Sequence, residues 1–344
     1  MSNSTGNFLS ALLRVLLSIF KKSPKPPAPP VTPTVPPDST TEPAQVVTRR
    51  VLVVTYDPVM DEEGTTLSQS QGWNRVETLI TAFSADILQA SGGMARYEII
   101  ERVERDEFPP KTDGFRYTPA TYLDVLRGVS PPHTPQGVDY HYILDGLNIL
   151  QRVTDGEIDE VWVFAFPYAG FYESVMAGKG AFWCNAPPLS DTAQCPRRFV
   201  IMGFNYERGV GEMLEAFGHR AESIMEQTFR RLQGEANLWK RFTRYDKIAP
   251  GKAAVGTIHF APNSEHDYDW NNPRLVPSEC DDWLHNFPNF QGEIRQVNAD
   301  EWGNGDMRAH HLWWLEHLPK VAGRINGIHN NWWQYIMDPQ RVIP

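Results

Sequence analysis

The chain has 344 residues, of which 41% are hydrophobic and 22% are charged, and its formal net charge is −10. A chain of this length and composition can bury a sizeable core, as one large or two modest globular domains. The acidic balance and the lack of a Lys/Arg-rich stripe in the folded part argue against nucleic acid as a partner. The 11 Trp, 12 Tyr and 17 Phe residues indicate an aromatic core or an aromatic-lined groove.

An apolar run at residues 8–20 ends at Lys21 and Lys22. It is too short for a membrane-spanning helix, which needs roughly 20 apolar residues. No basic residue precedes it and no small-x-small cleavage pattern follows, so it departs from a typical export signal. We expect residues 1–22 to form an amphipathic helix whose 8–22 segment binds a membrane surface or a docking partner. An atypical export signal, or no specific role, remains an alternative.

Residues 23–48 are rich in Pro, Ser and Thr, a composition that stays extended and does not pack. This linker would tether the N-terminal helix to the folded part of the chain. The alternation of strand and helix patterns predicts an α/β core over residues 49–250. The remainder, 251–344, is irregular and rich in Trp and His, and we expect a subdomain packed on the core.

The core pattern mixes short apolar runs of strand length with helical segments, which indicates an α/β (α+β) fold with a mixed sheet. In chain order the predicted elements are a strand at 51–56, a helix at 73–90, a strand at 96–105, helices at 119–127 and 140–153, strands at 160–166 and 198–204, and a long helix at 207–232. Two further helices are expected at 307–317 and 331–337.

The long helix carries Glu215, His219 and Glu222 at positions i, i+4 and i+7. At 3.6 residues per turn these side chains share one face, and their oxygen and nitrogen atoms suit a divalent metal. A solvated acidic face with His219 paired to Glu215 is the plainer alternative. Gly218 favours the metal site, because a glycine destabilises a helix unless another segment must approach closely there.

The run Glu215-Ala-Phe-Gly-His219 resembles the active helix of the zincin metallopeptidases, whose pattern is His-Glu-x-x-His. Glu215 stands where the first ligand His belongs, and Ala216 stands where the catalytic Glu belongs. The order of strands and helices over residues 50–232 is also similar to that of the zincin N-terminal half. The resemblance implies a zincin-like mixed sheet with a ligand-bearing helix, a bound zinc ion and peptidase-like hydrolysis. With Ala216 in place, the group that activates water must come from elsewhere.

Further ligands are expected downstream, where zincins take their remaining ligand. The segment 256–270 contains His259 and His266 together with an Asn and two Asp residues in a turn-rich stretch. Either His could equally be an ordinary hydrogen-bonding loop residue. The predicted metal ligands are therefore Glu215, His219, Glu222, His259 and His266.

Three residues are candidates for acid–base work. Glu222 is the helix carboxylate left over if Glu215 binds the metal, and Glu173 lies in the loop after the 160–166 strand, where it would compensate for Ala216. His310 lies in the predicted 307–317 helix, which otherwise reads as a packing helix whose Trp residues fill the core.

These observations predict a tethered or exported zinc-dependent hydrolase that acts on peptide or an envelope polymer outside the cell or at its envelope. A cytoplasmic location with a docking helix is the alternative. A non-catalytic module of the same fold is a second reading, in which Trp302, Trp313, Trp314, Trp332 and Trp333 hold a glycan or a protein. A glycoside hydrolase using two carboxylates is a third.

Two smaller features leave alternatives open or exclude functions. Cys184 and Cys195 bracket a Pro-rich loop and could form a disulfide or remain free thiols. No Gly-x-Gly-x-x-Gly, Walker A or Gly-x-Ser-x-Gly sequence stands at a strand–helix junction. Nucleotide binding and serine-hydrolase chemistry therefore have no support.

Overall fold

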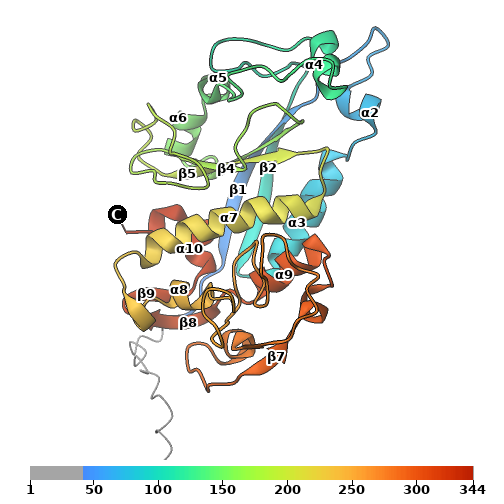
Figure 1. Ribbon diagram of the computed structural model, residues 1–344. Coiled ribbons are helices and arrows are strands. Elements are labelled where there is room, and N and C mark those ends of the chain that lie inside the picture. The colour runs from blue at the N-terminus through green and yellow to red at the C-terminus, as the bar shows by residue number, and fades with distance from the viewer. Residues whose placement is uncertain (1–41, 344) are drawn as a thin grey trace, which may run out of the picture. The chain divides into compact units, whose positions relative to one another are not determined.

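Helix α7, Val210–Phe229, lies between a five-stranded sheet and the C-terminal part of the chain (Figure 1). The computed structural model describes residues 42–343. The predicted N-terminal helix at 1–22 and most of the 23–48 linker lie outside the described residues. Within 42–343, no helix has the length and apolar character needed to cross a membrane.

The sheet is mixed, as predicted, with strand order β2-β1-β3-β5-β4. Four strands run parallel, and the edge strand β4 is antiparallel to β5. The central strand β3 is buried along its whole length, which explains its uninterrupted apolar sequence. The short edge strand was not predicted. The strands are β1 (Val47–Tyr56), β2 (Ala95–Arg105), β3 (Glu160–Ala165), β4 (Ser174–Ala177) and β5 (Phe199–Asn205).

The predicted helices form in the expected order with one split, and two short helices, α2 and α8, were not predicted. The segment predicted as a helix at 140–153 is two helices, because Asn148 adopts a left-handed backbone conformation with φ of 50° between them. The helices are α2 (Leu67–Gln71), α3 (Val76–Ala90), α4 (Pro119–Leu126), α5 (Tyr140–Gly146), α6 (Ile149–Thr154), α8 (Leu238–Phe242), α9 (Met307–Glu316) and α10 (Trp333–Met337).

An aromatic cluster holds the sheet, α3 and α7 together. Phe83 of α3 packs against Trp162 of β3, Phe204 of β5 and Phe217 of α7, with ring centroids 5.3, 5.5 and 6.0 Å away. All four side chains are buried. Edge-on and tilted aromatic contacts of this kind add to the burial of apolar area. The cluster fixes the face of α7 that is turned toward the sheet.

A buried ion pair fixes the rotation of α7 as well. Arg220 Nη1 donates to Glu160 Oε1 at 2.6 Å, and both side chains are almost fully buried. Trp162 Nε1 donates to the same carboxylate oxygen at 2.8 Å, and Arg220 Nε donates to the Ile336 carbonyl within α10. Because Arg220 faces the sheet, the neighbouring His219 is directed away from it.

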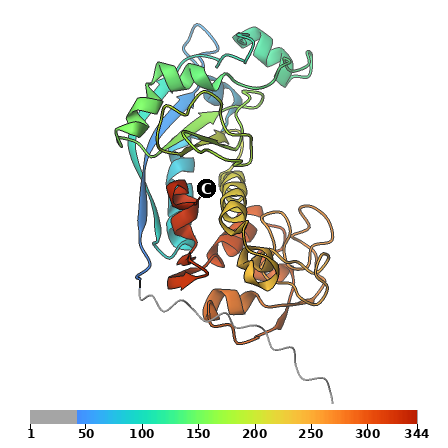
Figure 2. The same cartoon turned by 90° about the vertical axis from the view of Figure 1, so that its left-hand side faces the viewer.

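The C-terminal part packs against α7 through α8, α9 and α10, and α10 also contacts β1 and β2 of the sheet (Figure 2). It contains two short antiparallel pairs, β6 (Val276–Ser278) with β7 (Arg295–Val297) and β8 (Lys320–Ile325) with β9 (Ile328–Asn331). Four of the five tryptophans considered for a groove fill the core, since Trp302, Trp314, Trp332 and Trp333 are all at most 1% exposed, and Trp313 is partly buried against the same core. The three cysteines, including Cys184 and Cys195, are buried free thiols.

Candidate metal centre

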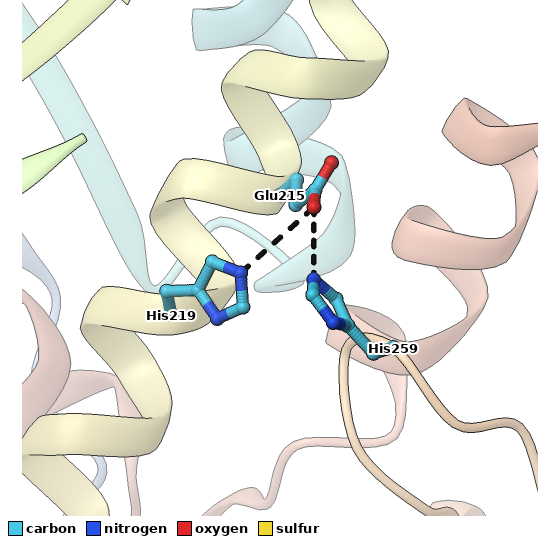
Figure 3. A group of neighbouring side chains, drawn as sticks. All are labelled: Glu215, His219 and His259. Carbon is cyan, nitrogen blue, oxygen red and sulfur yellow. Dashed lines mark hydrogen bonds and ion pairs between the residues drawn. The ribbon is translucent and has the colours of Figure 1, made fainter. Parts of the chain in front are cut away.

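Helix α7 carries its two inner site residues one turn apart. The helix begins after Gly209, whose backbone N–H donates to the Glu212 carboxylate at 3.0 Å and so closes the first turn. Glu215 follows and is buried, and His219 lies one turn further with a side chain 18% exposed. Both point away from the sheet toward the segment that follows the helix (Figure 3).

His259 approaches from that segment and completes a cluster with Glu215 and His219 (Figure 3). Its Nε2 atom lies 2.9 Å from Glu215 Oε1, and His219 Nε2 lies 3.9 Å from the same oxygen. The ligand atoms of all three residues lie within 4.8 Å of one another. Two imidazole nitrogens and a carboxylate oxygen therefore converge on one point, which is the donor set of many catalytic zinc sites.

A second layer of carboxylates orients both imidazoles. His219 Nδ1 lies 3.2 Å from Glu222 Oε2, and His259 Nδ1 lies 2.9 Å from Asp267 Oδ1. Since each carboxylate accepts the Nδ1 proton, Nε2 is the atom left to bind a metal in both rings. This carboxylate–histidine arrangement is the one that supports metal-ligating histidines in proteins. Glu222, predicted as a ligand, thus lies behind His219 instead of beside the shared point.

Tyr268 is a site residue that the sequence did not single out. Its hydroxyl donates to Glu215 Oε1 at 2.7 Å and lies 3.2 Å from His259 Nε2. Its backbone has φ of 58°, a conformation that side chains other than glycine and asparagine seldom adopt. Strain of that kind persists where the surroundings impose it. The only sequence signal was the density of His, Asp and Tyr residues in the segment after His259.

The interactions within the cluster favour the charged forms of Glu215, His219 and His259. Burial lowers the pKa of His219, but its interactions with Glu215 and Glu222 outweigh burial and raise the pKa to about 10. Burial alone would raise the pKa of Glu215, yet His219, His259 and Tyr268 hold it well below its usual range. The pKa of His259 is raised, against the effect of burial, mainly by Glu215. Glu215 is therefore a carboxylate surrounded by proton donors. A metal cation can displace the protons that His219 and His259 direct toward it.

Gly218 has the role that its place in the helix suggested. A Cβ atom at this position would lie 2.4 Å from Ile258 Cγ1, far inside van der Waals contact. The Ile258 backbone N–H donates to Glu222 Oε1 at 3.0 Å. Because Ile258 precedes His259, the missing side chain at Gly218 lets the downstream segment come close enough to bring His259 to Glu215.

Glu173 lies close to the His219 ring. Its Oε2 atom is 4.0 Å from His219 Nε2, and its side chain is 45% exposed. Asn185 Nδ2 donates to the same oxygen at 2.7 Å, and the Asn185 backbone N–H donates to Ser223 of α7. Glu173 and Ala216 line one small cavity of about 50 Å³. Glu173 and Ala216 therefore lie close to one another.

Two predicted residues lie elsewhere. The His266 side chain is 73% exposed and its Nε2 faces Asp269 Oδ1 at 3.4 Å, so it does not join the cluster. His310 is fully buried, stacks on Trp270 and places its Nδ1 3.2 Å from His311 Nδ1. Burial holds its pKa well below the usual range, so His310 is a neutral side chain of the core. Neither position is suited to the predicted role.

Comparisons with known protein families, with curated proteins and with solved structures found no match to this chain.

Proposed function

We propose that the protein is a metal-dependent hydrolase that binds one divalent cation, most simply zinc, through Glu215, His219 and His259. The observation that carries the proposal is the convergence of two Nε2 atoms on one carboxylate oxygen, with each Nδ1 held by a second carboxylate. A solvated acidic face would not need a histidine from a segment 40 residues downstream, nor a matching carboxylate behind each ring.

The residues present fit a metal by their donor chemistry. A divalent cation bound there would supply Lewis-acid activation of a carbonyl and of water. Glu215 would contribute its negative charge, and Glu222 and Asp267 would keep both imidazoles in the tautomer that leaves Nε2 free. The Tyr268 hydroxyl, already 2.7 Å from Glu215 Oε1, is placed to donate a hydrogen bond to an oxyanion of the substrate.

Glu173 is our candidate for the general base. The exposed carboxylate lies 4.0 Å from His219 Nε2 and is oriented by Asn185, so it can take a proton from water at the site. It stands beside Ala216 in the same cavity, which supports a carboxylate supplied by the loop before β4 in place of the one that the helix lacks. Glu222 is less suited, because both of its oxygens are engaged by His219 and Ile258.

The arrangement of the fold is consistent with a zincin-like protein, and we include that likeness in the proposal. A strand, a helix, further strands and then a ligand-bearing helix follow one another along the chain, as the resemblance implies. Peptide, or an envelope polymer containing peptide, is the proposed substrate class. A location outside the cell or at its envelope, with the N-terminal segment as tether, is part of the same proposal.

Metal analysis tests the proposal directly. The full chain is purified without chelators, and metal is measured by mass spectrometry for wild type, His259→Gln and His266→Gln. We expect about one zinc per chain in wild type and in the His266 variant, and a loss in the His259 variant. The exposed His266 is the matched control, since it lies seven residues away on the same segment. Equal metal content in all three proteins, or none in any, contradicts the proposal; iron in place of zinc would redirect it toward oxygen chemistry.

A further inference from the structure

A cavity of about 580 Å³ opens directly beside the candidate metal centre. His219 and His259 line one end of it, and Glu222, Glu226 and Arg230 of α7 line one wall. A volume in this range suits a ligand of several residues or a small molecule. The cavity is therefore the natural place for the part of a substrate that extends away from the metal.

Charge changes along this wall in a fixed order. Glu222, Glu226 and Arg230 are four residues apart, so they follow one face of α7, with a rise of about 6 Å between neighbours. Glu222 is bound to His219 and to the Ile258 backbone, whereas Glu226 has no ion-pair partner among the described residues. Glu226 thus places a negative charge about two turns beyond His219, and Arg230 places a positive charge about three turns beyond it.

The far end of the cavity carries a second cation. Lys240 of α8 lines it together with Arg230, and neither side chain pairs with a carboxylate within residues 42–343. Arg230 Nη1 donates to the carbonyls of Gln227 and Ile343, which are uncharged acceptors. Two cations that line one cavity and have no carboxylate partner among residues 42–343 attract an anionic group, most strongly a carboxylate or phosphate.

The opposite wall is aromatic. Tyr245 and Phe260 stack with ring centroids 4.8 Å apart, and Trp239 lies beside them along the cavity. Thr243 and Thr257 add hydroxyl groups at the edge. Such a wall contacts the apolar stems of a chain without selecting a single side chain. Selectivity must therefore come from the charges on the α7 wall and at the far end.

We propose that this cavity binds a short peptide chain that ends in a free carboxylate at Arg230 and Lys240 and carries a cationic side chain opposite Glu226. The proposal deepens the proposed function and rests on it for the position of the scissile bond. From His219 to Arg230 the helix rises about 16 Å, which an extended chain spans with about five residues. The substrate class is thus a peptide tail with a terminal carboxylate roughly five residues from the metal centre.

Binding to the full chain tests this without any need for hydrolysis. Two fluorescent five-residue peptides with a central lysine, one a free acid and one a C-terminal amide, are titrated against metal-free protein. We expect the free acid to bind about tenfold more tightly, because a charge-assisted hydrogen bond is lost in the amide. The preference should vanish in the Arg230→Gln/Lys240→Gln double variant and persist in Lys252→Gln, a lysine outside the cavity.

Replacing the central lysine by glutamate tests the middle of the cavity. It should weaken binding to wild type by about tenfold and have a smaller effect on Glu226→Gln. Equal affinity for acid and amide, an unchanged preference in the double variant, or no binding of either peptide at millimolar concentration would overturn the proposal. These outcomes are independent of metal content, so a chain that holds no metal but selects the free acid would refute the hydrolase and leave this cavity assignment standing.

Discussion

The contact between Gly218 and Ile258 gives the sharpest test of how the site is built. In Gly218→Ala, the new Cβ would lie 2.4 Å from Ile258 Cγ1, 2.5 Å from Cδ1 and 3.0 Å from Cβ. Carbon atoms rest at about 3.5–4 Å, so Ile258 must retreat by about 1 Å. Contact with Cβ itself means that a change of rotamer cannot relieve the overlap, and the backbone before His259 must move.

Two opposing effects set the stability of this variant. Alanine favours a helix over glycine by about 1 kcal/mol, while overpacking of a core costs about 1–3 kcal/mol. The net loss of unfolding free energy should therefore lie between about 0 and 2 kcal/mol, and the protein should stay folded. Metal affinity should fall more clearly, by about 10- to 100-fold, because a 1 Å shift moves His259 and disturbs the support of Glu222.

Metal affinity is measured by chelator competition, and stability by urea unfolding monitored through Trp fluorescence. Gly211→Ala is the matched control, since it lies in the same helix and its Cβ would meet the flexible Met307 side chain at 3.2 Å and the Arg308 backbone nitrogen at 3.5 Å, an ordinary contact distance. The double variant Gly218→Ala/Ile258→Ala should regain part of the affinity that each single change removes. If Gly218→Ala binds metal as tightly as Gly211→Ala, close approach at Gly218 is not what positions His259.

Three other predictions concern the base, the core and acid stability. Glu173→Gln should keep its metal and lower hydrolysis of a peptide substrate by about 10²- to 10⁴-fold, so loss of metal or full activity would exclude it as the base. Glu160→Gln leaves the buried Arg220 charge without its ionic partner and should lower the free energy of unfolding in urea by about 3–5 kcal/mol. An unchanged unfolding midpoint would contradict this prediction. Burial lowers the pKa of His317 to about 4, below its unfolded value near 6.5. The folded state therefore prefers the neutral imidazole, and about 3 kcal/mol of unfolding free energy that is present above pH 6.5 is lost as the pH falls toward 4. His317→Gln should flatten this pH dependence of unfolding, and an equally steep curve would show that other groups cause it.

Elements that bury one continuous apolar face were predictable from the sequence. The run that became β3 and the periodic stripe of α7 specify their conformation locally, and both formed within a few residues of the expected bounds. Strand β4 was missed because its four residues, Ser174–Ala177, are extended only through pairing with β5. The break at Asn148 was missed because a left-handed residue leaves no mark on hydrophobic periodicity.

The candidate site divides along the same line. Glu215 and His219 were predictable, since helical spacing alone places both on one face. His259 was expected from the composition of its segment, but the same reasoning also included His266. The fold of the loop directs His259 toward Glu215 and leaves the His266 side chain exposed. The role of Tyr268 depends on a tertiary contact to Glu215, some 50 residues earlier, and that of Asp267 depends on how the loop folds back onto His259. No spacing rule connects such positions.

The proposed ligands and the candidate base come from different parts of the fold, and this separation bears on the proposed function. The proposed metal ligands come from α7 and the segment that carries His259, which Gly218 brings together. The candidate base comes from the loop before β4, held to α7 through Asn185 and Ser223. In the proposed hydrolase the two are separate, whereas a catalytic glutamate at position 216 within the helix would be positioned by the same turns as the metal ligands. Metal binding and proton transfer can therefore be lost independently in this architecture, and a non-catalytic binding module would differ from a hydrolase only at Glu173 and its anchor.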